Sequence, residues 1–489
     1  MKRPASTLKT CSTMAIALKK FVFIPPILMF LLAATHLDAQ KEQPLPKDLP
    51  AYGPQPAFEG PDVKASKMDN GLAVWLVAQP GLPKISLSVA VLGGMASDPA
   101  SRPGMSELLA RSLKQGTKTR SAKQIAEDIR AAGGDLETGA NRDRIVVSTS
   151  VLSAKAEAAV ALLADVLQNA SFSEEEVTLA KRNLSESLRQ REAQPGFQAN
   201  RALAHVLFGS GPYSVIAPTQ ESLAQTTSAD LRQEYARRFR PDQSMIVAVG
   251  DFDPAKMSAL LKEKLSGWKA PAAPPATVNA KATAPAPHGV YFVARPNSVQ
   301  TTLVLASFGP LRGDPDYEAT QLANAVYGGT FSSRLISNIR EDKGYTYSPG
   351  SNLQALRQAG IVRTQADVRN AVTGASLNEI NYELNRMVTT TPTEEELRRA
   401  KRFLLGIEAI QLQSRAAVAG ELASLWLSGL PPDGIATYGK KINSATAEEV
   451  DTAAQKYFPA SRMAIVAVGE EKVIRDALSH FGLPLEPAK

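Results

Sequence analysis

The chain has 489 residues, 44% of them apolar and 21% charged, and a formal net charge of +7 at neutral pH. At roughly 150 residues per domain, this length predicts two to four domains. Residues 1–39 alone hold five Lys or Arg against one Asp, a net charge of +4 that leaves only +3 for the rest of the chain. Because no cluster of Lys and Arg interleaved with aromatic residues occurs elsewhere, the charge argues against nucleic-acid binding.

Residues 1–39 have the layout of an export signal peptide. A basic stretch ends at Lys20, an apolar run extends from Phe21 to Ala34, and Ala39 is a small residue where cleavage could fall. The run is shorter than a comfortable membrane span, so a cleaved signal is expected, with an uncleaved anchor as the alternative. The only cysteine, Cys11, lies inside this segment, so the mature protein would have no disulfide. An exported protein stabilised by its core alone is expected in the bacterial periplasm.

Residues 40–63 contain six prolines and predict an extended arm without a core of its own. A first half follows at residues 64–266, where apolar periodicity alternates with capping residues and with Gly or Pro turns. Strands are expected at residues 72–78, 85–92, 145–151 and 245–249. Helices are expected at residues 104–113, 121–132, 155–167 and 173–191.

The second half, residues 289–489, repeats this order. The segment Ser173–Val177 (SEEEV) recurs 220 positions later as Thr393–Leu397 (TEEEL), and Ile246–Gly250 (IVAVG) recurs as Ile465–Gly469, offset by 219. In both copies of the first segment a Ser or Thr precedes a Glu by three residues, which predicts a capping box at a helix start. The strand at 85–92 likewise has a counterpart at 301–308. Two signals that agree on one period indicate an internal duplication.

Residues 267–288 separate the two halves and are rich in Ala and Pro. Such a composition packs poorly and extends easily, so it predicts an interdomain linker. Two α/β halves joined by an exposed tether predict a hinged pair, with a cleft between them as the expected binding site.

The sequence after residue 39 contains few of the motifs that are typical of catalytic sites. Three histidines remain, His205, His288 and His480, each without a second His or a Cys at ligand spacing. This excludes a zinc site built from neighbouring His and Cys ligands on one helix, and each His is expected to be a packing or surface residue. The sequence also lacks a glycine-rich phosphate loop after a strand, a G-x-S-x-G elbow and a cysteine nucleophile.

The segment Phe331–Ser348 (FSSRLISNIREDKGYTYS) places an arginine and a tyrosine close together. Its apolar residues predict a short amphipathic helix that ends at Gly344. Arg340, near the helix end, and Tyr347, just past the turn, could present a guanidinium and a phenol to one carbonyl group, as peptide cleavage requires. Taken alone, the pair is better explained by the helix macrodipole, which favours Arg at a C-terminus, and by the packing of a Tyr after a turn.

Longer stretches of the sequence resemble a known family. The first half contains GGMASDPASRPGMSELLARSLKQGTKTRSAKQIAEDIRAAGG and FSEEEVTLAKRNL, and the second half contains SSRLISNIREDKGYTYS. Over residues 63–485 this order resembles the pitrilysin/insulinase family of zinc peptidases, the inverzincins. With the internal repeat, the resemblance implies an α+β fold of two homologous α/β halves, each an antiparallel sheet covered by helices, joined by the linker in a clamshell arrangement. In that family, H-x-x-E-H on a helix of the N-terminal half supplies two zinc-binding His and a Glu that activates water, and a later Glu completes the site.

This chain departs from the family at the metal site. The stretch GMSELLAR stands in place of the motif, with Glu107, Ala110 and Arg111 at the positions of its His, Glu and His. The third ligand would fall near Glu186 or Ser187. With both imidazoles and the general base absent, the resemblance implies that this chain holds no zinc and no other cofactor. Glu107 and Arg111 are four residues apart on one helical face, so an ion pair could occupy the vacated site; a solvated surface pair is the alternative.

The second half keeps the other part of the family's site. In the family, the C-terminal half supplies an Arg and, seven residues on, a Tyr that reach the substrate backbone at the scissile bond. The matching residues here are Arg340 and Tyr347, with Tyr345 as the rival if the register slips. The implied role is oxyanion stabilisation, in which the phenol and the guanidinium donate hydrogen bonds to the carbonyl oxygen as negative charge develops on it.

A chain with the Arg/Tyr half-site and without the zinc half-site resembles the non-catalytic partner in the family's heterodimeric members. The resemblance implies an exported subunit that is inactive alone, clamps a peptide together with a homologous H-x-x-E-H subunit, and completes that partner's zinc site with Arg340 and Tyr347. The alternative is a catalytically inert peptide-binding or scaffold protein of the same fold, in which the pair is structural. An enzyme active alone through another metal site has no support, since the sequence shows no other ligand cluster.

Overall fold

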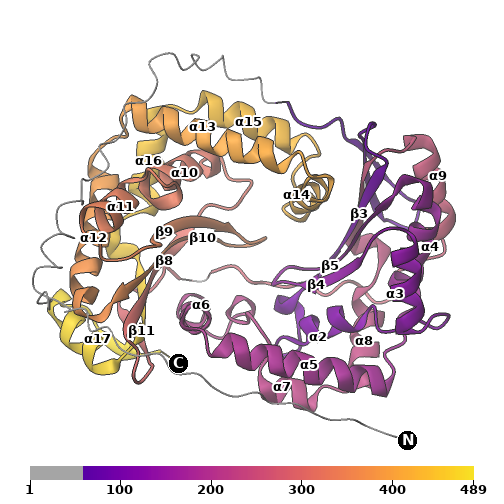
Figure 1. The fold of residues 1–489 in the computed structure, drawn as a ribbon, viewed down its shortest axis with the longest axis horizontal. Coiled ribbons are helices and arrows are strands. Elements are labelled where there is room, and N and C mark those ends of the chain that lie inside the picture. The colour runs from indigo at the N-terminus through magenta and orange to yellow at the C-terminus, as the bar shows by residue number, and fades with distance from the viewer. Residues whose placement is uncertain (1–58, 283, 489) are drawn as a thin grey trace, which may run out of the picture. The chain divides into compact units, whose positions relative to one another are not determined.

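The computed structural model describes residues 59–282 and 284–488. The expected signal peptide, residues 1–39, and most of the proline-rich arm, residues 40–63, lie outside the described residues. The described chain forms two α/β halves on either side of the linker, and Figure 1 labels their elements. None of the described helices is both long and apolar enough to cross a membrane.

The first half contains one six-stranded sheet. Its strands are β1 (Lys64–Lys67), β2 (Ala73–Ala78), β3 (Lys84–Leu92), β4 (Leu136–Ala140), β5 (Arg144–Leu152) and β6 (Ser244–Gly250). Its helices are α2 (Met105–Ser112), α3 (Ala122–Ala131), α4 (Ala156–Asn169), α5 (Glu174–Glu192), α6 (Pro195–Phe208), α7 (Gln220–Gln225), α8 (Ser228–Arg238) and α9 (Pro254–Leu265). The four strands and four helices expected from the sequence are confirmed to within two residues at each end.

The second half contains a matching sheet. Its strands are β7 (Val290–Ala294), β8 (Gln300–Gly309), β9 (Gly350–Ala355), β10 (Gly360–Arg369), β11 (Ala464–Gly469) and β12 (Leu485–Pro487). Its helices are α10 (Tyr317–Asn324), α11 (Arg334–Ile336), α12 (Thr373–Thr389), α13 (Glu394–Gln411), α14 (Arg415–Leu427), α15 (Gly434–Ser444), α16 (Ala447–Tyr457) and α17 (Glu471–Leu478), with π-helical segments η5 (Ala325–Gly329) and η6 (Ser337–Asp342).

Five strands of each sheet have the same order, which confirms the duplication; the edge strands β1 and β12 differ, since β1 is the first strand of its half and β12 the last. The first runs β1-β2-β6-β3-β5-β4 and the second runs β12-β7-β11-β8-β10-β9. The central strands β6 and β11 are buried at every residue, as their uninterrupted apolar sequence requires. Most neighbours are antiparallel, but β2 lies parallel to β6, and β7 lies parallel to both β11 and β12. The expected fold class is confirmed, with mainly antiparallel, mixed sheets.

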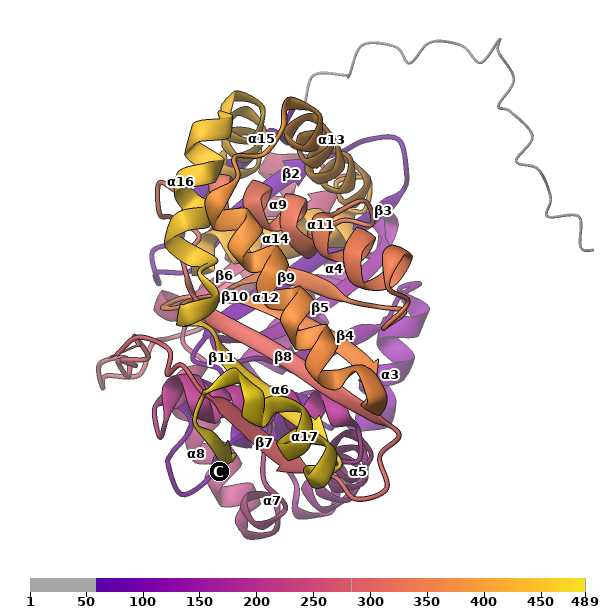
Figure 2. The ribbon, with the colours of Figure 1, turned by 90° about the vertical axis from the view of Figure 1, so that its left-hand side faces the viewer.

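Each sheet has helices of its own half on one face and a helix of the other half on the opposite face. Figure 1 shows α3, α4 and α9 beside the first sheet, and Figure 2 shows α12 and α17 in front of the second. On the opposite faces, Leu422 of α14 packs against the first sheet, and Leu203 of α6 packs against the second. Because the halves exchange a helix in this way, they share their cores, and this packing opposes the hinge motion expected from the linker.

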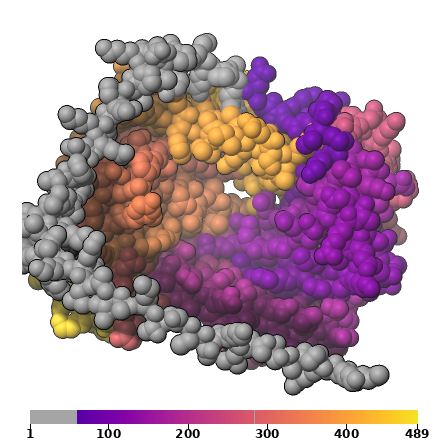
Figure 3. Space-filling view, viewed as in Figure 1, coloured from indigo at the N-terminus to yellow at the C-terminus, as the bar shows by residue number. Residues whose placement is uncertain are grey.

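Hydrogen bonds of one buried tyrosine also join the halves. Tyr213 donates its phenol hydrogen to Asp143 and accepts one, at 3.1 Å, from the backbone nitrogen of Gln358 in the turn between β9 and β10. The side-chain amide of Gln358 donates to the carbonyl oxygen of Val278 in the linker at 2.7 Å. Burial, with the Asp143 carboxylate beside it, raises the pKa of the Tyr213 phenol well above its usual value. The linker is therefore bound along the seam between the halves, while Figure 3 shows that the surface is hollowed elsewhere between them.

Candidate functional site

Helix α2 carries the positions of the missing zinc motif, and its start requires a glycine. Gly104 precedes the helix with a φ of +77°, and a Cβ added to it would lie 2.1 Å from the backbone nitrogen of Pro218. Both the left-handed conformation and the close approach exclude a larger residue. Leu108 and Ala110 are fully buried in the core of the first half, which turns Glu107 of the same helix towards α5.

The position of the first zinc-binding His holds Glu107, which lies between two arginines. Its carboxylate accepts a hydrogen bond from Arg111 Nη2 at 3.1 Å, one turn further along α2, and from Arg191 Nη2 at 3.1 and 3.2 Å, near the end of α5. The side chain of Glu107 is 12% exposed, against 42% for Arg111 and 34% for Arg191. The predicted Glu107–Arg111 ion pair is confirmed, and its carboxylate is largely withdrawn from solvent.

This arrangement does not fit a zinc ion. The guanidinium groups of Arg111 and Arg191 carry the same sign of charge as the metal and already occupy the oxygens of Glu107, while the methyl group of Ala110 offers neither a ligand nor a base. On α5, Glu186 is exposed and pairs with Arg189 at 3.2 Å. Within residues 59–282 and 284–488, no three His, Cys, Asp or Glu side chains are grouped so that they could hold a metal ion.

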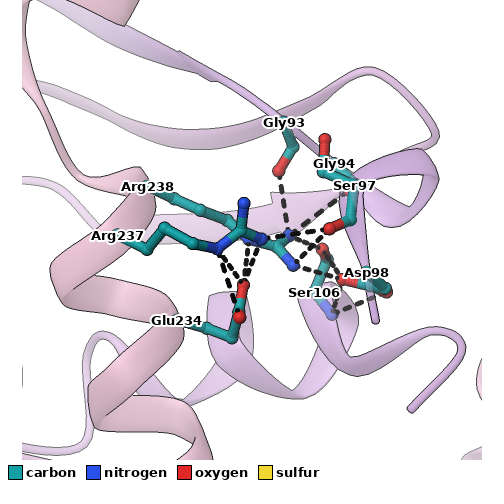
Figure 4. Close-up of polar contacts among 8 residues, drawn as sticks. All are labelled: Gly93, Gly94, Ser97, Asp98, Ser106, Glu234, Arg237 and Arg238. Carbon is teal, nitrogen blue, oxygen red and sulfur yellow. Dashed lines mark hydrogen bonds and ion pairs between the residues drawn. The ribbon is translucent and has the colours of Figure 1, made fainter. Parts of the chain in front are cut away.

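A buried network of charged groups holds the start of α2 (Figure 4). Arg238, at the end of α8, donates to Asp98 at 2.8 Å, to Glu234 at 2.7 Å and to the hydroxyl of Ser106 in α2 at 2.5 Å. Its other hydrogen bonds go to backbone carbonyl oxygens of the loop before α2, those of Gly93, Gly94 and Ser97. Asp98 in turn accepts from the backbone nitrogen of Ser106 at 3.1 Å. The network therefore fastens the loop, α2 and α8 to one another.

The charges of this network are nearly withdrawn from water. The side chains of Arg238, Asp98 and Glu234 are 3%, 1% and 9% exposed. Burial raises the pKa of the Asp98 carboxyl above its usual value, and the Arg238 guanidinium opposes this rise. These residues were not predicted from the sequence. Glu234 and Arg238 are four residues apart on a helix, a pattern typical of a solvated surface pair, and no local signal shows that a distant loop covers them.

Arg340 and Tyr347 lie at the end of an irregular helix and in the turn after it. The predicted short helix is confirmed as α11, which widens into the π-helical η6. It ends at Gly344, as expected, where φ is +61°. The backbone nitrogens of Gly344 and Tyr345 donate back to the carbonyl oxygens of Arg340 and Ile339 at 3.2 and 2.9 Å. Widened helical turns of this kind are frequent at functional sites.

The Arg340 guanidinium lies between two aromatic rings. Its Cζ is 4.5 Å from the ring centroid of Phe331 and 4.6 Å from that of Tyr347, both within cation–π range. Its Nε also pairs with Glu341 at 3.1 Å. Phe331 is 65% and Tyr347 79% exposed, so this stack stands at the surface. Tyr345 is half-buried and has no ring contact with Arg340 in the described part of the chain, so the geometry favours Tyr347 as its companion.

The stack leaves donors available to another molecule. Among the described residues, the terminal nitrogens of Arg340 and the phenol of Tyr347 have no hydrogen-bond partner. Adjacent guanidinium and phenol groups can donate to one oxygen that gains negative charge, and the rings restrict the plane of the guanidinium. No hydrogen bond, ion pair or ring contact within residues 59–282 and 284–488 joins this pair to Glu107. The chain thus presents two separate groups.

These features define the class of protein: a duplicated α/β fold of the metallopeptidase type whose metal-motif position lacks its ligands. Comparison with protein families agrees with this description. The model for insulinase, peptidase family M16, matches residues 73–212, and the model for the peptidase M16 inactive domain matches residues 225–404. The chain belongs to the M16, or pitrilysin/insulinase, family.

Individual proteins that match over most of their length also support membership of this family. An uncharacterised zinc protease of Mycobacterium leprae is 26% identical over 394 residues, which cover 80% of this chain and 88% of that protein. The crystal structure of a peptidase M16 inactive domain from Pseudomonas fluorescens matches with a TM-score of 0.78 and 26% identity, over 84% of this chain and 98% of that one. A protease from Helicobacter pylori shares the fold with a TM-score of 0.78 at 19% identity, over 83% and 99% of the two chains.

Proposed function

We propose that this chain is the zinc-site-deficient subunit of an exported heterodimeric zinc metallopeptidase. A homologous subunit brings H-x-x-E-H and its zinc, and this chain supplies Arg340 and Tyr347 to the substrate carbonyl at the scissile bond. The observation that carries the proposal is the contrast between the two motif positions. Glu107 is enclosed by two arginines, whereas Arg340 and Tyr347 are stacked at the surface with unused donors.

The chemistry assigned to the pair is stabilisation of charge. When the peptide carbonyl carbon becomes tetrahedral, its oxygen gains negative charge and strengthens any hydrogen bond that it accepts. Arg340 would contribute a planar donor with a permanent positive charge, and Tyr347 a neutral O–H donor from the other side of the turn. Activation of the attacking water belongs to the partner subunit. Loss of one such donor typically costs about 2.7–4 kcal/mol of transition-state stabilisation.

Reconstitution with an H-x-x-E-H homologue tests this role. Such a homologue encoded beside this chain is the first choice of partner. Each purified chain alone is expected to be inactive towards a fluorogenic peptide, and the mixture active. Tyr347→Phe keeps the ring on Arg340 and removes only the O–H, so it should lower kcat about 10²- to 10³-fold without loss of assembly by size-exclusion chromatography. Arg340→Ala should lower kcat similarly, while Tyr345→Phe serves as the matched control and should retain activity.

The alternative function, a catalytically inert peptide-binding or scaffold protein, predicts a different result. Peptide would then bind this chain alone, and both variants would assemble with the partner and leave its turnover at the wild-type rate. Export is tested separately by N-terminal sequencing of the protein from a periplasmic extract. The mature chain is expected to begin at Gln40, and a chain that keeps Met1 in the membrane fraction would support an uncleaved anchor.

A further inference from the structure

A cavity of about 210 Å³ lies where the two halves and the linker meet. Its wall combines the turn between β4 and β5, the end of α8, the turn between β9 and β10, and linker residues 275–278. Its charged residues are five arginines and a single acid: Arg142, Arg237, Arg238, Arg240, Arg357 and Asp143. Neither the Glu107 cluster nor the Arg340 stack contributes to this wall.

Two of these arginines are fully engaged, and a third is engaged only in part. Arg240 binds both oxygens of Asp242 at 2.6 and 2.8 Å, and Arg238 belongs to the buried network that holds α2. Arg237 binds Glu234 through Nε and Nη2. Its Nη1 has no partner among the described residues, and Figure 4 shows this nitrogen turned away from the carboxylate.

Neither of the other two arginines has a side-chain hydrogen bond or ion pair among the described residues; Arg357 is exposed, whereas the more buried of the two is Arg142. Its side chain makes no hydrogen bond or ion pair within residues 59–282 and 284–488, its Nε is buried without a partner, and its Cζ lies 5.8 Å from the ring centroid of Phe208. The adjacent Asp143 is already used, since its two oxygens accept from the phenol of Tyr213 and from the backbone nitrogen of Arg357. Burial lowers the pKa of the Arg142 guanidinium below its usual value. A largely buried cation without a counter-charge costs free energy unless an anion neutralises it.

We propose that this cavity binds a small oxyanion, of the phosphate or carboxylate kind, between Arg142, Arg237 and Arg357. Guanidinium groups donate paired, planar hydrogen bonds that match the oxygens of both anions. Arg142 and Arg237 come from the first half and Arg357 from the second, so a bound anion bridges the halves beside the Tyr213 hydrogen bonds. Because it binds only the closed, folded seam, the anion stabilises the folded chain by mass action.

The test measures anion affinity of the full chain without its signal. Inorganic phosphate and citrate are titrated separately by calorimetry, with sodium chloride holding the ionic strength constant. At least one of the two should bind in a saturable way and raise the midpoint of thermal unfolding, and the stronger ligand identifies phosphate or carboxylate chemistry. Arg142→Gln should weaken that binding about tenfold or more, because it removes the most buried of the cations that have no partner of their own.

The matched control is Arg144→Gln. Arg144 is two residues along the same hairpin and also has buried, unpartnered nitrogens, Nε and Nη1, but it does not line the cavity. Its replacement removes the same charge and should leave the affinity unchanged. Arg357→Gln, at an exposed turn residue, should also weaken binding and covers the case in which Arg142→Gln fails to fold. Absence of saturable binding of both anions, or equal weakening by Arg142→Gln and Arg144→Gln, would overturn the proposal.

Discussion

Replacement of Arg238 by methionine should destabilise the first half by about 3 kcal/mol. Removal of one member of a buried charged network typically costs about 3–5 kcal/mol, because the remaining charge stays buried without compensation. Here the lower end applies. Glu234 keeps its hydrogen bonds to Arg237 at 3.1 and 3.2 Å, so only Asp98, 1% exposed, loses its counter-charge. Methionine fills much of the volume of the arginine stem, so the loss measures charge rather than a cavity.

The dependence on pH separates this cause from simple loss of packing. Burial raises the pKa of Asp98 in the folded state above its unfolded value of 3.8, so stability linked to this group is fully present below about pH 3.8 and is lost as the pH rises through the folded pKa. Without Arg238 the folded pKa rises further, and the deficit of Arg238→Met should grow from about pH 4 to pH 7.

The assay is urea unfolding of the wild type, Arg238→Met, Asp98→Asn and the double variant at both ends of this pH range. In the Arg238→Met background, Asp98→Asn removes the uncompensated charge and should recover on the order of 1–2 kcal/mol at pH 7. A loss below about 1 kcal/mol for Arg238→Met, or further destabilisation by Asp98→Asn in that background, would contradict an uncompensated Asp98 charge as the cause.

Two further substitutions probe other contacts. The Arg334 guanidinium, bound to Glu396 at 2.7 Å, lowers the pKa of that carboxyl from 4.5 to about 2, a change of roughly 3 kcal/mol that partial exposure reduces to the order of 2. Urea unfolding should therefore show that Glu396→Gln is less stable than the wild type above pH 4.5. This difference in the free energy of unfolding should disappear as the pH falls through 2. The control variant Glu394→Gln should show no such difference. Tyr213→Phe should destabilise the chain by about 1–3 kcal/mol, since it removes the hydroxyl that donates to Asp143. It should also speed hydrogen exchange of the backbone amides in the linker. Unchanged exchange there would mean that the contacts between the halves do not hold the linker.

The predicted elements with strong periodicity were correct because each buries its own apolar face within its own half. Helix α6 was missed for the opposite reason. Its apolar residues, among them Ala199 and Leu203, pack on the sheet of the other half, and no local pattern specifies that partner. The two capping boxes predicted from the sequence were confirmed only in part. Thr393 and Glu396 exchange both hydrogen bonds, whereas Ser173 accepts from the backbone of Glu176 and the return bond is absent from α5.

The candidate site was predictable where its residues are close in sequence. Glu107 and Arg111 are one helical turn apart, so their ion pair follows from spacing alone. Arg191 belongs to another helix, and its approach to Glu107 depends on how α2 packs against α5. The contact between Arg340 and Tyr347 agrees with the family pattern. Phe331, which completes the stack from before the helix, carries no signal that distinguishes it from an ordinary apolar residue.

The position of the zinc motif, at Glu107, and the Arg340 stack differ in their electrostatics. A zinc site places a doubly charged cation between two helices, and its loss would leave any acidic group there without a counter-charge. In this chain Arg111 and Arg191 supply positive charge on either side of Glu107, so α2 and α5 remain joined by electrostatic attraction without a metal. The contact between α2 and α5 therefore does not require a metal ion at this position. Since the fold holds the Arg340 stack in place, retention of the fold and of a surface donor pair is what the proposed subunit role requires.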